Sequence, residues 1–409
     1  MKRFSDFLKL NNMNRLIVLI ILCCMQLTAL CQVNPQKSNT GFVKHIIFKD
    51  FISEGVAVGD VNKDGKMDIL AGPSWFEAPT WKRHDIDTFK TYAPKTAYSR
   101  SFLNHAMDIN QDGWIDLIVL DFPGLSADWF ENPGNKTGYW KKHRLYDNVG
   151  NESPLFIDVD GDGQDDLICA DSKTNQVIWL QAPAKGETEW KRFEVGKRNV
   201  LGTDILGHGL GYGDLNSDGR KDIFTKDGWW EGHGDVKQQD WIFHPADIGE
   251  DCSQMQVVDV NADGLPDVVS ASAHRYGIWW HPQYKDDDGN RQWDHRTISF
   301  STSQTHATAM ADFNGDGNPD LVTGKRYFAH LEHLNPSNKT TIDPGTYGKP
   351  AIYWFELTPG KSPYWKEHLI DDDSGIGLNI VAQDMNGDGK PDIVIANKHG
   401  IFFFENSMK

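Results

Sequence analysis

The chain has 409 residues, of which 39% are hydrophobic and 24% are charged. This balance excludes an intrinsically disordered chain, which has too few apolar residues for its charge. The formal net charge is −17 and no basic stripe runs along the chain, so composition argues against a nucleic-acid partner.

Residues 1–31 have the pattern of an export signal. Arg15 precedes an apolar run over residues 16–22, and the small-residue pattern Ala29-Leu30-Cys31 follows. The run is too short to span a membrane. We therefore predict export to the periplasm or the outside. A surface lipoprotein on Cys31 is the lesser alternative, because Leu30 stands where a lipidation signal has a small residue.

One nine-residue pattern, Asp-x-Asn/Asp-x-Asp-Gly-x-x-Asp, recurs seven times along the rest of the chain. Oxygen ligands at its first, third, fifth and ninth positions can wrap a hard cation, because glycine at the sixth position permits a sharp turn. A plain turn with solvated aspartates is the alternative, and seven complete copies favour structural Ca²⁺ in up to seven loops. The predicted ligands are Asp60, Asn62, Asp64, Asp68, Asp108, Asn110, Asp112, Asp116, Asp158, Asp160, Asp162, Asp166, Asp214, Asn216, Asp218, Asp222, Asp259, Asn261, Asp263, Asp267, Asp312, Asn314, Asp316, Asp320, Asp384, Asn386, Asp388 and Asp392.

The copies begin 45 to 72 residues apart, a spacing that suits one four-stranded blade each. In each repeat one apolar strand enters the loop and a second leaves it. A third carries an aromatic pair such as Trp129-Phe130, and a fourth usually carries Trp-x-x-His. These patterns predict an all-β, seven-bladed β-propeller over residues 42–409.

The two ends of this region predict how the ring closes. Residues 42–47 look like a fourth strand without a blade, whereas the last repeat ends soon after Glu405 and has no room for a fourth strand. We therefore expect the N- and C-terminal strands to pair, which hides two sheet edges that would otherwise be exposed.

The seven repeats also separate scaffold from candidate site. Histidines that recur at one outer-strand position are predicted to be structural: His45, His84, His143, His244, His295 and His368. Other polar residues do not recur, and they stand before the first strand or between the second and third strands: Glu54, His105, Glu152, His208 and His306, and Asp121, Asp171, Lys226, His274, Arg275, Tyr276, Lys325, Arg326, Tyr327, His330, Lys398 and His399. We expect these residues to rim a central funnel opposite the loops, with an insertion from about Ala329 to Gly348 over it.

The chemistry of this rim favours elimination over hydrolysis. The chain has no nucleophilic serine or cysteine motif and no His-Glu-x-x-His pattern. A hydrolase with two carboxylates would use Glu54, Glu152, Asp121 or Asp171. Imidazoles, phenols and cations together instead suit β-elimination from a uronic acid. We predict His208 or His306 as base, Tyr276 or Tyr327 as acid, and a substrate-binding set of His105, His274, Arg275, Lys325, Arg326 and His330, in which the arginines hold the carboxylate.

The loops and aromatic strands resemble the FG-GAP and VCBS repeat families over roughly residues 42–406. That resemblance implies a calcium-loop propeller, a fold that serves adhesion, sugar binding and lyase chemistry. The segment Lys-Arg-Tyr-Phe-Ala-His, residues 325–330, also looks like exported Bacteroidota propellers that degrade algal polysaccharides. This second resemblance implies a dehydratase or lyase that forms 4,5-unsaturated uronic acid from uronate-containing oligosaccharides such as those of ulvan. The alternative is a non-catalytic, integrin-like propeller that binds carbohydrate or protein.

Overall fold

The computed structural model describes residues 36–37, 41–250, 254–330 and 343–408. The chain divides into two compact units, Met1–Gln36 and Lys37–Lys409. The predicted export signal, residues 1–31, and residues 331–342 of the predicted insertion lie outside the described residues, so the predictions about them remain predictions. The described residues form strands and turns without any α-helix, which confirms the all-β class.

Most strands belong to four-stranded antiparallel units that are consecutive in the sequence. The strands are β1 (Gln36–Lys37), β2 (Phe42–Phe48), β3 (Ala57–Gly59), β4 (Asp68–Ala71), β5 (Ser74–Glu77), β6 (Lys82–Asp85), β7 (Leu103–Met107), β8 (Asp116–Leu120), β9 (Leu125–Glu131), β10 (Lys141–Ile157), β11 (Asp166–Asp171), β12 (Gln176–Gln181), β13 (Lys191–Glu194), β14 (Gly211–Gly213), β15 (Asp222–Thr225), β16 (Gly228–Glu231), β17 (Ile242–Pro245), β18 (Gln256–Val258), β19 (Asp267–Ala271), β20 (Tyr276–His281), β21 (Gln283–Lys285), β22 (Arg291–Trp293), β23 (Arg296–Ser303), β24 (Thr308–Ala311), β25 (Asp320–Gly324), β26 (Ile352–Thr358), β27 (Tyr364–Asp371), β28 (Ile380–Gln383), β29 (Asp392–Asn397) and β30 (Gly400–Asn406).

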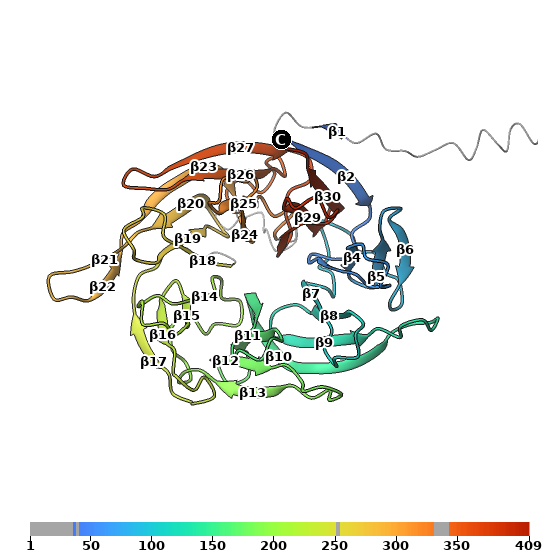
Figure 1. Ribbon diagram of the computed structural model, residues 1–409, viewed down its shortest axis with the longest axis horizontal. Coiled ribbons are helices and arrows are strands. Elements are labelled where there is room, and N and C mark those ends of the chain that lie inside the picture. Colours follow the sequence, from blue (N-terminus) through green and yellow to red (C-terminus); the bar gives the residue numbers. More distant parts are fainter. Residues whose placement is uncertain (1–35, 38–40, 251–253, 331–342, 409) are drawn as a thin grey trace, which may run out of the picture. The chain divides into compact units, whose positions relative to one another are not determined.

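The sheets of the second unit are arranged around a common centre (Figure 1), with β7, β14, β18 and β24 near that centre. Four sheets contain β3–β6, β14–β17, β18–β20 with β23, and β24–β27. A larger sheet holds β7 to β13, because the 17-residue strand β10 pairs with β9 and then continues to pair with β11. The register shifts between Gly150 and Leu155, where the long strand bends.

The predicted pairing of the chain's two ends is confirmed. Strand β2 pairs antiparallel with β30, so that Phe42 lies opposite Asn406 and His45 opposite Phe403. The resulting sheet has the order β2-β30-β29-β28 and therefore combines the first long strand with the last three. This pairing protects the edge of β30.

Neighbouring sheets pack face to face through apolar side chains. Ile168 and Trp179 of the large sheet pack in one cluster with Ile223 and Trp230 of the next sheet. The strand that leaves each loop is buried throughout, as β8 shows, because sheets cover it on both faces. Outer strands such as β6 remain half-exposed. The core thus lies between the sheets and holds them at fixed positions around the centre.

Five of the six recurring histidines lie on the outer strands, as predicted, and His295 lies just before β23. Five of them stack on an aromatic ring of the third strand and bond to its glutamate: His45 on Phe403 with Glu405, His84 on Trp75 with Glu77, His143 on Trp129 with Glu131, His244 on Trp229 with Glu231, and His368 on Trp354 with Glu356. His295 differs, since its Nδ1 lies 2.7 Å from Nδ1 of His281.

Candidate functional site

Four histidines that flank the strands of three sheets meet near the centre of the second unit. His208 precedes β14, His274 lies between β19 and β20, His306 precedes β24, and His330 follows β25. Ring centroids lie 4.7 Å apart for His208 and His274, 5.4 Å for His208 and His306, and 5.1 Å for His274 and His330. We call these four residues the histidine cluster.

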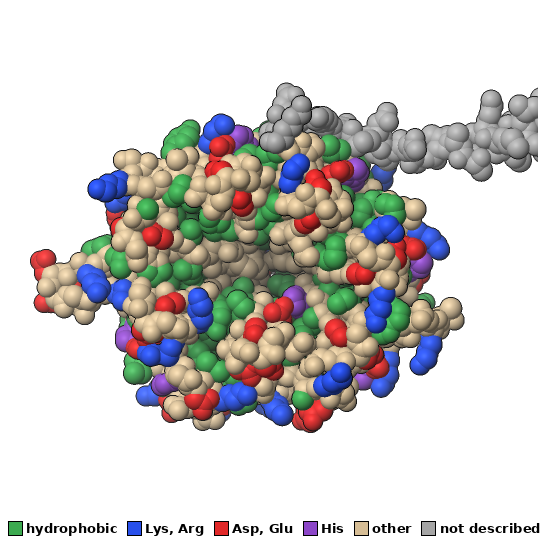
Figure 2. Space-filling view, in the orientation of Figure 1, with side chains coloured by type: hydrophobic (Ala, Val, Ile, Leu, Met, Phe, Trp, Pro, Cys, Tyr) green, Lys and Arg blue, Asp and Glu red, His purple; other side chains and the backbone are tan. Residues whose placement is uncertain are grey.

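Backbone bonds between neighbouring sheets place the residues before the innermost strands at this centre. Glu54 donates its N–H to the carbonyl of Ser101 at 2.9 Å and accepts one from Leu378 at 3.0 Å. Glu152 donates to the carbonyl of Gly207 at 2.9 Å. These backbone bonds join the segments that precede the innermost strands of neighbouring sheets. They explain why the side chains before those strands converge, as predicted for Glu54, Glu152, His208 and His306. Figure 2 shows that the surface is hollowed in the middle of the view.

Two carboxylates and two cations are buried beside the histidine cluster. Arg326 is only 2% exposed. Its Nη2 lies 3.4 Å from Oε2 of Glu54, and its Nη1 lies 3.3 Å from Oε2 of Glu152. Nζ of Lys398 lies 3.5 Å from Oε1 of Glu54. Lys398 lies over the ring of Tyr98, 4.2 Å from its centroid. The aromatic ring and the carboxylates together compensate cations that would otherwise be costly to bury.

The burial of these groups shifts their pKa values in opposite directions. Burial raises the pKa of Glu54, although Arg326 and Lys398 oppose the shift. Burial also acts to raise the pKa of Glu152, but His208 and Arg326 outweigh it and lower the pKa to about 2. Burial lowers the pKa of Lys398 to about 8. Glu152 is thus ionised at neutral pH.

His306 is buried and neutral. Burial lowers its pKa well below the usual value, and the charge of Arg326 lowers it further. Its Nδ1 lies 2.9 Å from the carbonyl oxygen of Gln304, which can only accept, so Nδ1 carries the hydrogen. Nε2 therefore holds the lone pair, and it is a buried nitrogen without a hydrogen-bond partner. His306 is therefore a neutral imidazole with a free lone pair, although burial and the charge of Arg326 weaken it as a base.

His208 has a different charged neighbour. Its Nε2 lies 3.5 Å from Oε2 of the ionised Glu152, whereas His306 lies beside the Arg326 guanidinium. Two adjacent imidazoles with opposite electrostatic surroundings suit a pair in which one accepts and the other donates a proton.

On the more exposed side of the cluster, Asp343 joins two of the rings. Its Oδ2 lies 3.2 Å from Nδ1 of His274 and 3.1 Å from Nδ1 of His330. Burial acts to raise the pKa of Asp343, but its bonds to both histidines hold that pKa below the usual range. The sequence reasoning missed Asp343, because it stands far along an insertion that no other repeat contains. It also missed Tyr98, whose repeat position carries no comparable residue.

The two cations assigned to substrate at the start of the insertion already have protein partners. Nζ of Lys325, a residue 3% exposed, bonds to the carbonyls of Thr346 and Gly348 as well as that of Gly345, and thereby anchors residues 345–348. Arg326 is held by Glu54 and Glu152. We correct both assignments to structural roles, because neither side chain is open to a substrate carboxylate.

Three other predicted site residues contact partners outside the cluster. The ring of His105 stacks on Phe156 and its Nε2 lies 3.0 Å from Oδ2 of Asp165, so it faces the next repeat's loop. Tyr327 lies against His399, and Tyr276 borders a pocket with Lys325. These contacts do not test the predicted role of either tyrosine as the acid, so that role stays a prediction.

Arg275 and the outer acidic residues also lie elsewhere. The side chain of Arg275 is 74% exposed, with Nη1 4.0 Å from Oε1 of Glu250. Asp121 pairs with Arg100, and Asp171 lies 3.1 Å from Arg192. Of the carboxylates considered for a hydrolase, only Glu54 and Glu152 reach the centre.

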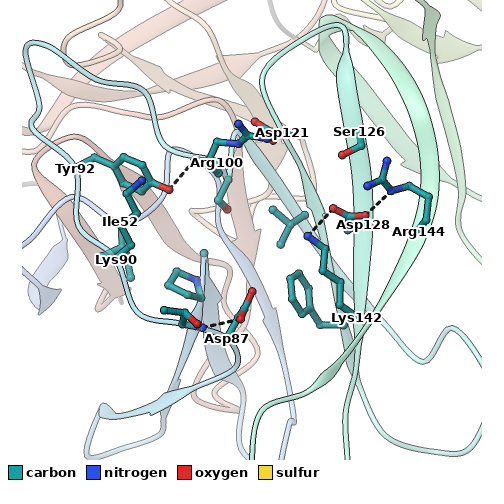
Figure 3. A pocket seen from close by; sticks show the side chains of 16 residues that line it. Ile52, Asp87, Lys90, Tyr92, Arg100, Asp121, Ser126, Asp128, Lys142 and Arg144 are labelled. Carbon is teal, nitrogen blue, oxygen red and sulfur yellow. Dashed lines mark hydrogen bonds and ion pairs between the residues drawn. The ribbon is translucent and has the colours of Figure 1, made fainter.

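A pocket of about 330 Å³ lies between the sheets of β3–β6 and β7–β13, and none of the four clustered histidines lines it (Figure 3). Three of its four cations pair with carboxylates of the same pocket, whereas Lys90 lies over the ring of Tyr92. Asp128 lies 2.8 Å from Nζ of Lys142 and 2.7 Å from Nε of Arg144, and Arg100 pairs with Asp121. Most of the cations in this polar pocket therefore already have an anionic partner.

The seven acidic loops have a donor set that fits a hard cation. In the first loop, Asp60 accepts the N–H groups of Asp64 and Gly65, both at 3.0 Å, which folds the loop around its first carboxylate. In the third loop, oxygens of Asp158, Asp160 and Asp166 lie within 4.8 Å of one another.

The ninth aspartate of each loop is fully buried: Asp68, Asp116, Asp166, Asp222, Asp267, Asp320 and Asp392. Burial raises the pKa of Asp116 to about 8 and that of Asp166 to about 7, and the nearby carboxylates add to the shift. A bound cation would relieve this repulsion, so the residues fit the predicted Ca²⁺.

The family model of the FG-GAP-like repeat matches residues 108–169, 158–225 and 259–323, which confirms the predicted repeat in these segments. No curated protein matches the chain. The chain is similar to the solved rhamnogalacturonan lyase YesW, with 10% identity over 93% of this chain and 75% of that chain and a TM-score of 0.45. A rhamnogalacturonan lyase of Bacillus licheniformis gives 10% identity, the same coverages and a TM-score of 0.43. BBS1N in complex with ARL6DN gives 9% identity, 89% and 98% coverage and a TM-score of 0.46. Likeness of this degree does not identify an activity.

Proposed function

We propose that the chain is an exported carbohydrate-active eliminating enzyme, a dehydratase or lyase. It forms 4,5-unsaturated uronic acid from uronate-containing oligosaccharides of an algal polysaccharide such as ulvan. The observation that supports this most is the pair of central imidazoles. His306 is neutral with a buried, unpartnered Nε2, and His208 lies beside it facing the carboxylate of Glu152.

In the proposed step, Nε2 of His306 accepts the proton from C5 of the uronate, and the electron pair of the C5–H bond forms the C4–C5 double bond. The C4–O bond breaks, and the leaving oxygen takes a proton from His208. Glu152 orients His208 and carries the charge that opposes His306. We propose His208 as the acid in place of Tyr276 or Tyr327, because it lies beside His306 and faces Glu152.

For the scaffold, we propose a seven-bladed propeller with Ca²⁺ in its loops. If β10 is counted in two blades, the sheet order contains seven four-stranded units, the last completed by β2. The buried ninth aspartates support a cation at each loop. Seven bound divalent ions would neutralise most of the formal net charge of −17.

The runner-up function is a binding module for carbohydrate or protein. It is favoured by the burial of His306, a residue 1% exposed, and by the pairing of Arg326 with two protein carboxylates. In that case the central groups hold the sheets together, and ligands bind at outer pockets such as the one in Figure 3.

The described residues contain no helix with the length and apolarity that a membrane crossing needs.

The two functions are separated by incubating the protein with defined uronate oligosaccharides. Ultraviolet absorbance reports a new 4,5-double bond, and calorimetry reports binding. We expect substrate-dependent absorbance that Ca²⁺-saturated protein sustains over many turnovers. Binding without any unsaturated product would overturn the enzyme and leave the binding module.

A further inference from the structure

We infer that His274, His330 and Asp343 form a binding site for a divalent transition-metal ion such as Zn²⁺. The three side chains come from separate segments: a link after β19, the segment after β25, and the far end of the insertion. Each offers one ligand atom, and these atoms all lie within 4.8 Å of one another. The inference concerns residues that the sequence assigned to substrate binding or did not single out.

The spacing of the ligand atoms fits a metal. Zn–N and Zn–O bonds of about 2.1 Å place the ligand atoms of a tetrahedral site about 3.4 Å apart. Oδ2 of Asp343 lies 3.2 Å from Nδ1 of His274 and 3.1 Å from Nδ1 of His330. Two edges of the tetrahedron are therefore already close to the required length.

Hydrogen bonding alone explains the arrangement less well. Oδ2 of Asp343 faces both ring nitrogens and also Nε2 of Gln304 at 3.3 Å, so three donors would share one oxygen. The two rings are stacked with centroids 5.1 Å apart, which brings their Nδ1 atoms to the same oxygen. A cation between the three ligand atoms would replace two crowded donors, and Gln304 would then orient the ligating carboxylate.

The ligand types select the class of ion. Two imidazoles and one carboxylate suit Zn²⁺ and its neighbours among the transition metals, whereas Ca²⁺ prefers oxygen ligands alone. Three protein ligands leave at least one coordination position open. All three residues are only partly buried, so an ion can enter from the solvent.

The site also has a role if the proposed function holds. His274 lies against His208, with ring centroids 4.7 Å apart, so the ion would bind next to the acid–base pair. An open position could take an oxygen of the uronate carboxylate, a task that Arg326 cannot perform because Glu54 and Glu152 already hold it. This role rests on the proposed function, but the metal site itself does not.

The test is Zn²⁺ binding at saturating Ca²⁺, so that the acidic loops are occupied. Metal-stripped protein is dialysed against Zn²⁺ and its content measured, and Co²⁺ is added in a parallel sample to record the visible spectrum of imidazole-bound cobalt. We expect one Zn²⁺ per chain in the wild type and at least about 10-fold weaker binding in Asp343→Asn and His330→Gln. His143→Gln is the matched control, because its single pair with Glu131 lies on an outer strand, and it should bind like the wild type.

Two results would overturn the site: wild-type protein that retains no stoichiometric Zn²⁺, or folded Asp343→Asn and His330→Gln proteins that bind it as tightly as the wild type. His274→Gln provides a third variant if either fails to fold. Zinc binding without unsaturated product would leave the metal site standing and reject the enzyme. Product formation by a protein that binds no Zn²⁺ would do the reverse.

Discussion

The histidines of the outer strands and those of the centre contain the same side chain in two different settings. On the outer strands, His143 stacks on Trp129 at 4.2 Å between centroids and bonds to Glu131 at 2.7 Å, and four other repeats copy this arrangement. At the centre, His208 and His306 contact other histidines and buried charges that no other repeat reproduces. The histidines that recur from repeat to repeat are therefore packed and hydrogen-bonded. The rings of His208 and His306 each keep a buried nitrogen without a hydrogen-bond partner.

The largest effect should come from removing the proposed Ca²⁺ from the acidic loops. A site with bound ligand at about 1,000 times its Kd contributes about 4 kcal/mol to the free energy of unfolding, and several sites contribute more. Excess chelator should lower the melting temperature strongly, and added Ca²⁺ should restore it. Calorimetry that shows the same melting with and without chelator would mean that the loops are plain turns.

Next in size is the central charge network. Arg326→Ala leaves Glu54 and Glu152 buried without their shared cation, so we expect a loss of about 3–5 kcal/mol in the free energy of unfolding. Arg275→Ala removes an exposed arginine of the neighbouring repeat. It should change the free energy of unfolding by less than about 0.5 kcal/mol. Urea unfolding compares the two, and equal effects would contradict a buried network.

The pH dependence of the unfolding free energy tests the same network without removing Arg326. Burial lowers the pKa of Lys398 from 10.5 to about 8, so between these values the unfolded chain binds more protons than the folded one. Wild-type stability should therefore rise with pH in this window, by up to about 3 kcal/mol relative to Lys398→Met. Urea unfolding at pH 8 and pH 10 measures the difference. A difference that stays constant would show that burial does not lower the pKa of Lys398.

The smallest effect is expected on the outer strands. His143→Gln loses the stack on Trp129 and the bond to Glu131, which together should cost about 1 kcal/mol in unfolding free energy. The unfolding midpoint measures this cost. A much larger loss would mean that the outer histidines carry more of the fold than their half-exposed positions indicate.

Turn residues and apolar strands act locally, and they predicted the all-β class. The incomplete first and last repeats predicted the pairing of β2 with β30. Sequence periodicity also predicted that Glu54, Glu152, His208 and His306 converge, since equivalent positions of repeats meet at one centre. It did not predict the partners of Lys325, whose Nζ binds carbonyls some twenty residues along the chain. Asp343 was missed for the same reason, because an insertion has no repeat to compare it with.

The contrast between central and outer histidines is tested most directly by the rate of unsaturated product formation in His208→Gln and His143→Gln, measured side by side on uronate oligosaccharides. The central substitution should lower the rate by about 100-fold to 10,000-fold, the usual range for a lost proton donor. The outer substitution should leave it unchanged in folded protein. Equal rates in the two variants, or a specific loss in His143→Gln, would contradict the assignment of chemistry to the centre.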